Sequence, residues 1–184
     1  MIRTLHTGIL VAAIATALTA SASSSLEAVR KLADTDLAAL GRDPVIVAAV
    51  QAQNATGRSL DEIKALDAKW QATAGVADFM RALIDSPAGK HLAAFKQGHA
   101  YVSEIFVMDR LGANVAQTDK TSDYWQGDEP KFTECFTGAG QVFLSKMEFD
   151  ESTQTYSIQV SVPVLEGDAL IGAICIGVDV EKIQ

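Results

Sequence analysis

The sequence has few of the residues on which metal and redox sites depend. It contains two cysteines, Cys135 and Cys175, in no Cys-x-x-Cys motif, and its histidines are His6, His91 and His99. So few ligands exclude the common zinc motifs. We expect two buried, apolar cysteines, although an exported protein could also pair them. No cofactor is predicted, since a haem would have only His91 or His99 as a ligand.

Catalytic motifs are also absent. The sequence has no Gly-x-Ser-x-Gly, no glycine loop for phosphate and no His-Glu-x-x-His. A hydrolytic or redox enzyme would need Cys135 as its nucleophile, and a reactive thiol must be accessible. We therefore predict a protein that is not an enzyme.

Positive charge is scarce and nowhere concentrated. Fifteen Lys and Arg residues stand against 23 Asp and Glu residues, which gives a formal net charge of −8. Nucleic acid is therefore excluded as an expected partner. The 184 residues, 48% of them hydrophobic, suffice for one domain with a packed core.

Long hydrophobic runs are lacking, apart from a short one near the N-terminus. Residues 8–18 are apolar, but a run of about 11 residues is shorter than the roughly 20 that span a bilayer. Arg3 before it and Ala20-Ser21-Ala22 after it complete a signal-peptide pattern. We predict a cleaved signal peptide at residues 1–22 and a periplasmic or secreted protein. An uncleaved N-terminal anchor is the alternative.

The first half of the remaining chain, residues 23–100, has helical spacing of its apolar residues. Helices are expected over 24–40 and 44–55, and shorter ones over 77–83 and 89–95. Between them, Ser59 and Glu62 form a capping box that opens a helix running toward Trp70.

The second half, residues 101–184, changes to the alternation of strands. Strands are expected over 105–108, 114–118, 142–144, 155–164 and 170–178. Asp109 should organise the first turn by accepting backbone N–H groups. In the insert at 119–137, Asp128 is the expected N-cap of a short helix that contains Pro130. Helices followed by strands predict an α+β domain with one five-stranded antiparallel sheet.

Four segments of this second half resemble the Cache family, the extracytoplasmic relatives of PAS domains. They are EIFVMDRLGANVA at 104–116, TSDYWQGDE at 121–129, VSVPV at 160–164 and IGAICIGVD at 171–179. The resemblance implies a PAS-like sheet with a long N-terminal helix behind it and a helical insert. It also implies a small-molecule pocket between sheet and insert.

The sequence departs from the family at its end. Family members usually continue into a transmembrane helix and a signalling module, whereas this sequence ends at Gln184. We expect a sensor domain without an output domain of its own, which would act through a membrane signalling partner.

The insert carries the first candidate ligand residues. Tyr124 and Trp125 could stack on a ligand or cap a cation, or they could close the core. Asp123 and Asp128 could accept from an ammonium or amide group, or cap a helix. Lys131 could pair with a ligand carboxylate, or be a surface lysine.

A polar stripe on the 155–164 strand supplies the second group. Ser157, Gln159 and Ser161 alternate with apolar residues, and Ser145 could join them. If this face meets the insert, the stripe lines a pocket. If it meets solvent, the pattern is ordinary alternation.

These observations predict an exported sensor domain for a small polar metabolite, which could be an amine, an amino acid or an organic acid. Its expected partners are a membrane receptor and a second copy, paired through the N-terminal helix. The alternative is a structural or interaction protein of the same fold without a ligand pocket.

Overall fold

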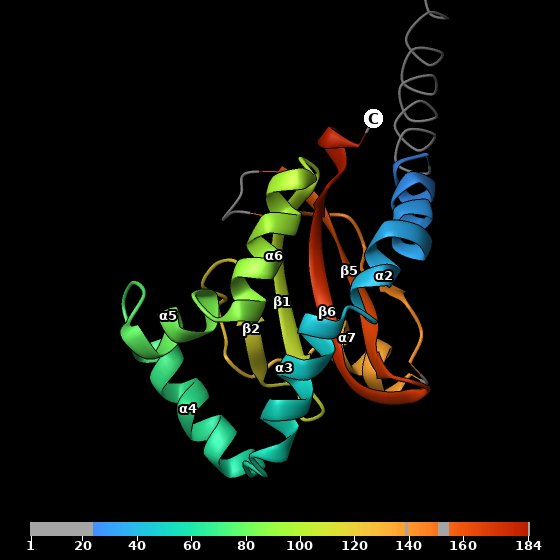
Figure 1. The fold of residues 1–184 in the computed structure, drawn as a ribbon. Coiled ribbons are helices and arrows are strands. Elements are labelled where there is room, and N and C mark those ends of the chain that lie inside the picture. The colour runs from blue at the N-terminus through green and yellow to red at the C-terminus, as the bar shows by residue number, and fades with distance from the viewer. Residues whose placement is uncertain (1–23, 139, 151–154, 184) are drawn as a thin grey trace, which may run out of the picture.

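The structure, a computed structural model, describes residues 24–138, 140–150 and 155–183. These residues form an α+β domain, with most of its helices before residue 99 and an antiparallel sheet that begins at residue 102 (Figure 1). The predicted fold class is confirmed. The predicted signal peptide lies outside the described residues.

The helices follow the capping signals of the sequence. At α4, Ser59 accepts from the Glu62 N–H and Glu62 accepts from the Ser59 N–H, so the predicted capping box is confirmed. Residues 24–32 are helical and continue through a π turn at Ala33–Leu37 into α2. The other bounds are α2 (Ala38–Leu40), α3 (Pro44–Ala55), α4 (Leu60–Ala72), α5 (Asp78–Ile84), α6 (Pro87–Gly98) and α7 (Pro130–Phe132), which continues as a π turn at Thr133–Thr137.

The sheet has five positions in the order β2-β1-β6-β5-β3, and all its pairs are antiparallel. The last position is divided between two short strands, because β4 also pairs with β5. The bounds are β1 (Val102–Asp109), β2 (Asn114–Gln117), β3 (Phe143–Leu144), β4 (Glu148–Asp150), β5 (Thr155–Glu166) and β6 (Ala169–Asp179).

Both faces of the sheet are covered, by different elements (Figure 1). The N-terminal helix, α3 and α6 bury one face, where Ile158, Val160 and Val162 of β5 lie in the main core cluster. The insert, here its described residues 119–138 and 140–142, covers the other face. There Phe132 and Cys135 pack on the strands in a second apolar cluster, the insert cluster, whose other buried members are Phe106, Met108, Ala173 and Cys175.

A third cluster joins the side of the sheet to the insert. Helices α4 and α5 lie beside β2 (Figure 1), and Trp70 of α4 packs against Tyr124 at 5.7 Å between ring centroids. The Trp70 indole N–H also donates to the Thr121 carbonyl at 2.8 Å. The start of the insert is therefore fixed to α4.

Two local predictions need correction. Glu129, not Asp128, is the N-cap of α7, because Pro130 occupies the first helical position and the cap immediately precedes it. Strand β4 was not predicted, since Met147, Glu148 and Phe149 show no alternation long enough to identify a strand. The prediction for Asp109 is confirmed, since its carboxylate accepts from the Leu111 and Ala113 N–H groups at 2.8 and 3.0 Å.

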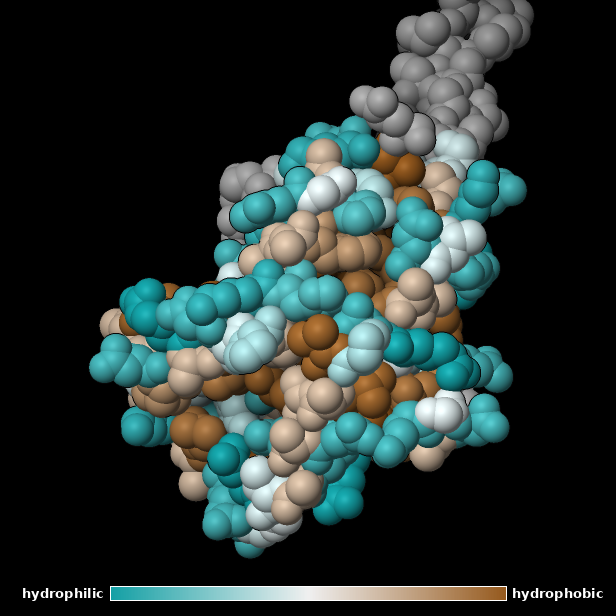
Figure 2. All heavy atoms as spheres, in the orientation of Figure 1, coloured by the Kyte–Doolittle hydropathy of each residue, from teal (hydrophilic) through white to brown (hydrophobic). Residues whose placement is uncertain are grey.

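The surface over α3 and α6 carries an apolar groove of about 550 Å³. Figure 2 shows hydrophobic side chains gathered near the middle of this face, with hydrophilic side chains around them. None of the helices in the described ranges is both long and apolar enough to span a membrane.

Gly112 lets the β1–β2 hairpin touch the insert. Its φ is +82°, and a Cβ there would lie 2.4 Å from the Gly127 Cα. Gly57 has a similar φ of +64° with nothing within 4 Å, which makes it a matched control. We predict that Gly57→Ala lowers the free energy of unfolding by about 1 kcal/mol. Gly112→Ala should cost at least about 2 kcal/mol more, because the insert backbone must shift.

Urea denaturation of the two variants and the wild-type protein measures this difference. Equal losses for Gly57→Ala and Gly112→Ala would contradict the close approach of the hairpin and the insert.

Candidate ligand-binding site

The polar stripe of β5 lies on the insert side of the sheet. Successive side chains of a strand point to opposite faces, so Ser157, Gln159 and Ser161 must lie opposite the residues that pack under α3 and α6. Ser161 is fully buried, and Ser157 is 9% exposed. The stripe is therefore not a solvated face.

Two of these residues line a pocket of about 300 Å³ between β5 and the start of α7, which we call the sheet pocket. The amide of Gln159 has no hydrogen-bond partner among the described residues, so it remains available to a ligand. The lining residues are Glu129, Lys131, Ser145, Glu148, Phe149, Ser157 and Gln159.

Lys131 is the cation of the sheet pocket. Its side chain is only 14% exposed, and its ammonium group pairs with Glu129 at 3.0 Å and lies 5.4 Å from the centroid of the Phe106 ring. Burial by itself lowers the pKa of Lys131, but the acidic groups around it, Cys175, Glu129 and Glu104, outweigh burial and raise that pKa above its usual value. Lys131 is therefore charged at neutral pH.

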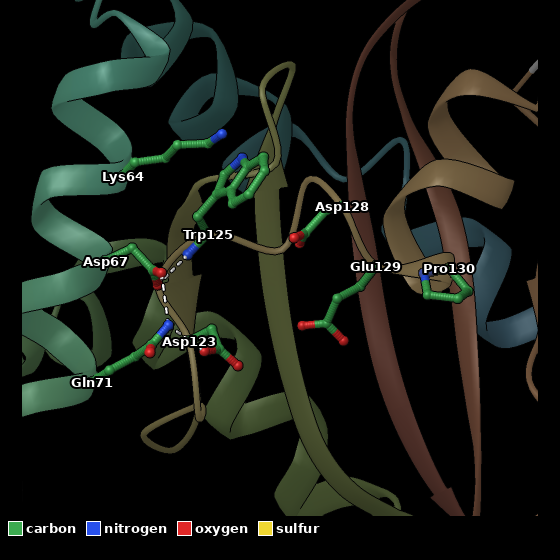
Figure 3. Close-up of a pocket in the computed structure, with 8 residues that line it drawn as sticks. All are labelled: Lys64, Asp67, Gln71, Asp123, Trp125, Asp128, Glu129 and Pro130. Atoms are coloured by element: carbon green, nitrogen blue, oxygen red, sulfur yellow. Dashed lines mark hydrogen bonds between the residues drawn. The ribbon is translucent and has the colours of Figure 1, made fainter.

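A second, wider cavity of about 630 Å³ lies between α4 and the insert, and we call it the α4 groove. Figure 3 shows Lys64, Asp67 and Gln71 on one side of it and Asp128, Glu129 and Pro130 on the other, with Asp123 and Trp125 between them. Glu129 lines both cavities, so the sheet pocket and the α4 groove adjoin at this side chain.

The walls of the α4 groove are mostly acidic. Asp67, Asp123, Asp128 and Glu129 face one lysine, Lys64, whose ammonium lies 4.5 Å from the centroid of the Trp125 ring. An aromatic face beside carboxylates attracts cations. Asp128 has no hydrogen-bond or ion-pair partner among the described residues, so it is the carboxylate most available to a bound cation.

The Asp67 carboxylate ties the insert to α4. Its Oδ1 accepts from the backbone N–H groups of Tyr124 and Trp125 at 2.7 and 3.0 Å. Figure 3 marks the bond from Trp125. The Gln71 amide donates to Asp67 and to Asp123, at 2.8 and 2.7 Å. Carboxylate and amide together hold the insert in position above the groove.

The predicted site residues fall into three groups: those that line the α4 groove, those that line the sheet pocket and those that line neither. Asp123, Trp125 and Asp128 line the α4 groove, whereas Lys131, Ser145 and Gln159 line the sheet pocket.

Tyr124 and Ser161 line neither cavity. Tyr124 is 2% exposed, and its hydroxyl contacts Arg58 at 2.8 Å and Gln53 at 3.4 Å. Ser161 is fully buried under the insert.

Several lining residues were not identified from the sequence. Lys64, Asp67 and Gln71 are spaced by three and four positions, which places them on one face of α4. That spacing indicates a shared helix face in the sequence, but only the fold shows that this face meets the insert. Glu129 was also missed, because Asp128 beside it was taken as the helix cap.

The area directly above β1 and β6 is filled. Phe132 and Phe136 of the insert stack with ring centroids 4.9 Å apart, and both pack in the insert cluster. Cys135 and Cys175 are free and buried in it, and burial raises the pKa of each thiol to about 12. Cys135 therefore lacks the access and ionisation that a nucleophile needs.

His91 and His99, the two histidines in the described ranges, each have a hydrogen-bond partner. His91 Nε2 lies 2.9 Å from an Asp43 carboxylate oxygen, and His99 Nδ1 lies 2.8 Å from the Phe95 carbonyl oxygen. Within the described ranges, no three His, Cys, Asp or Glu side chains are grouped to hold a metal ion.

We predict that Asp67→Ala releases the insert from α4. The two hydrogen bonds from the insert backbone to this carboxylate are lost together with the one from Gln71, which should lower the free energy of unfolding by about 2–3 kcal/mol. Hydrogen exchange at the amides of Tyr124 and Trp125 should become at least about tenfold faster. Asp61→Ala, at an exposed position of the same helix, is the control. Unchanged exchange in Asp67→Ala would show that another contact holds the insert.

The buried thiols predict a loss of stability in alkali. A native pKa of about 12 exceeds the ordinary value of 9.0, so the unfolded chain loses thiol protons first as the pH rises. The thiol contribution is complete below pH 9 and is lost between pH 9 and 12. Urea denaturation at pH 8 and pH 10 should show a larger drop for the wild-type protein than for Cys135→Ala/Cys175→Ala. Equal drops would mean that the thiols ionise in the native state.

Comparison with known proteins shows a likeness of fold. No protein-family model and no curated protein sequence matches this chain. Among solved structures, the sensor domain of the V. cholerae histidine kinase DctB is similar at a TM-score of 0.55 and 14% identity, over 93% of this chain and 58% of that one. The sensory domain of the Campylobacter jejuni chemoreceptor Tlp3 is similar at 0.46 and 15%, over 89% and 66%. The fold of this chain is therefore similar to that of the DctB domain, and the chain spans little more than half of that domain's length.

Proposed function

We propose that this protein is an exported, Cache-like sensor domain that binds a small polar metabolite between the sheet and the insert. Such a domain has no enzymatic role of its own and passes its signal to a membrane partner. Residues 1–22 would direct its export and be removed.

The observation that carries this proposal is the direction of the polar stripe on β5. Gln159 and Ser157 face the insert and line the sheet pocket with Lys131, rather than facing solvent. A pocket with a few convergent polar groups beside an aromatic ring is the usual form of a small-molecule site. Phe149 supplies that ring.

The charged side chains that line the two cavities favour a small polar ligand. Lys131 is a desolvated cation that would pair with the carboxylate of an organic acid or an amino acid. Glu129 would release Lys131 and receive an amine. Asp123, Asp128 and Trp125 of the α4 groove would hold the part of a longer ligand that extends past Glu129.

The N-terminal helix is the proposed contact to a second copy or to the membrane partner. Leu26 on this helix is 46% exposed, so part of its apolar side chain is accessible to a partner. A partner that covers it would bury apolar surface beside the sheet.

One observation favours a second function, that of an interaction protein with no ligand. Phe132, Cys135 and Phe136 fill the centre of the space beneath the insert, and the sheet pocket and the α4 groove lie at its sides. A partner complex that forms without any ligand response would support this alternative.

A thermal-shift screen of polar metabolites tests the sensor proposal, because a ligand that binds only the folded state raises the melting temperature. We expect at least one amine, amino acid or organic acid to do so. Lys131→Gln should weaken its binding by about tenfold or more, since a desolvated charge is lost. Lys90→Gln, at an exposed position of α6, should bind as the wild-type protein does.

The screen requires folded protein that carries no ligand from its expression host. If no metabolite raises the melting temperature, the sensor proposal is wrong and the function as an interaction protein remains. If Lys131→Gln and Lys90→Gln change the affinity for the metabolite equally, the ligand does not bind in the sheet pocket.

A further inference from the structure

Three buried side-chain amides near the insert have unused hydrogen-bonding atoms. Asn114 and Gln126 are each 1% exposed, and Gln117 is fully buried. The Oδ1 of Asn114, the Nε2 of Gln117 and the Oε1 of Gln126 have no hydrogen-bond partner among the described residues. A buried polar atom without a partner costs about as much as a lost hydrogen bond, so three in one place call for a cause.

The three amides belong to one network. Asn114 Nδ2 shares its two N–H donors among three acceptors: Gln117 Oε1 at 3.3 Å, Thr121 Oγ1 at 2.9 Å and the Asp123 carbonyl at 3.2 Å. Gln126 Nε2 donates to the same carbonyl at 2.8 Å. The three amide groups therefore lie close together, between β2 and the insert.

The orientation of each amide follows from this network. A backbone carbonyl can only accept, so the atoms of Asn114 and Gln126 that face the Asp123 carbonyl must be nitrogens. The Gln117 atom that faces Asn114 Nδ2 at 3.3 Å is its oxygen, because two amide nitrogens, both donors, would repel each other. The unused atoms are therefore two acceptors, on Asn114 and Gln126, and one donor, on Gln117.

These amides lie on the same face of the sheet as the sheet pocket. Gln117 pairs with Phe106 across β2 and β1, Phe106 pairs with Cys175 across β1 and β6, and Cys175 pairs with Ser161 across β6 and β5. The hydroxyl of Ser161, at the far end of this row, also lacks a partner. Above the row, the ammonium of Lys131 lies over the Phe106 ring.

We propose that Asn114, Gln117 and Gln126 form a subsite for an uncharged amide-type group of the ligand, either a primary carboxamide or a urea. Such a group has two N–H donors for the two acceptors and one carbonyl for the donor. A carboxylate has no donor and an ammonium has no acceptor, so each would leave buried atoms unpaired. The subsite deepens the proposed function and rests on it, because it places the neutral end of a ligand whose charged end meets Lys131.

The subsite is closed in this structure, so the ligand must part the insert from β2 to enter it. The insert is held there by the Asp123 carbonyl contacts and by Asp67. A ligand that replaces contacts of the Asn114 network would offset the cost of opening.

Matched pairs of small molecules test the subsite on the whole folded protein. Suitable probes are glutamine with glutamate, asparagine with aspartate, and nicotinamide with nicotinate, measured by titration calorimetry. For at least one pair, the amide should bind at least about tenfold more tightly than the acid, since the acid leaves buried donors and acceptors unpaired. Gln117→Leu should reduce that ratio to near one, and Gln97→Leu, at an exposed position of α6, should leave it unchanged.

The other outcomes contradict either the subsite alone or the sensor function as well. Acids that bind as tightly as their amides, or an amide preference that survives Gln117→Leu, overturn the subsite and leave the sensor proposal intact. The same holds if a permanently bound water satisfies the three amides, because then Gln117→Leu alters neither affinity. If no molecule of the pairs or of the wider metabolite screen binds, the proposed function fails, and the subsite fails with it.

Discussion

The covering of both faces of the sheet is the constraint on which the rest of this structure depends. A strand that faced solvent on one side could satisfy its polar residues with water. Here the helices bury one face and the insert covers the other, so polar residues under the insert must find partners inside the protein. This constraint is why Gln159, Lys131 and Ser161 are candidate functional residues. On a face open to solvent, water would satisfy the same polar side chains.

Patterns that act over a few residues were readable from the sequence. The alternation along β5, the capping box at Ser59 and the turn at Asp109 each predicted the local structure, because the interacting atoms lie within a few positions. The same local signals gave the fold class, and they indicated which β5 residues share a face. They could not show whether that face meets water or the insert.

The candidate site depends on contacts between distant segments, and these were not readable. Asp67 binds amides 57 and 58 positions away, so no local pattern links α4 to the insert. Tyr124 and Trp125 are neighbours, yet one is buried against Trp70 and the other faces the α4 groove. Adjacent aromatic residues look alike in sequence, and only the packing of α4 against the insert distinguishes them.

The positions of unpaired polar groups connect stability to function. Six buried side-chain atoms in the described part of the chain lack a partner. Five of them belong to the insert or to the sheet, namely those on Ser103, Asn114, Gln117, Gln126 and Ser161. A core chosen for stability alone would replace them with apolar side chains, because each unpaired atom destabilises the fold. Functional sites are where natural proteins retain such costs. The unpaired atoms and the desolvated Lys131 lie on one side of the sheet, which is the side that the two open cavities also adjoin.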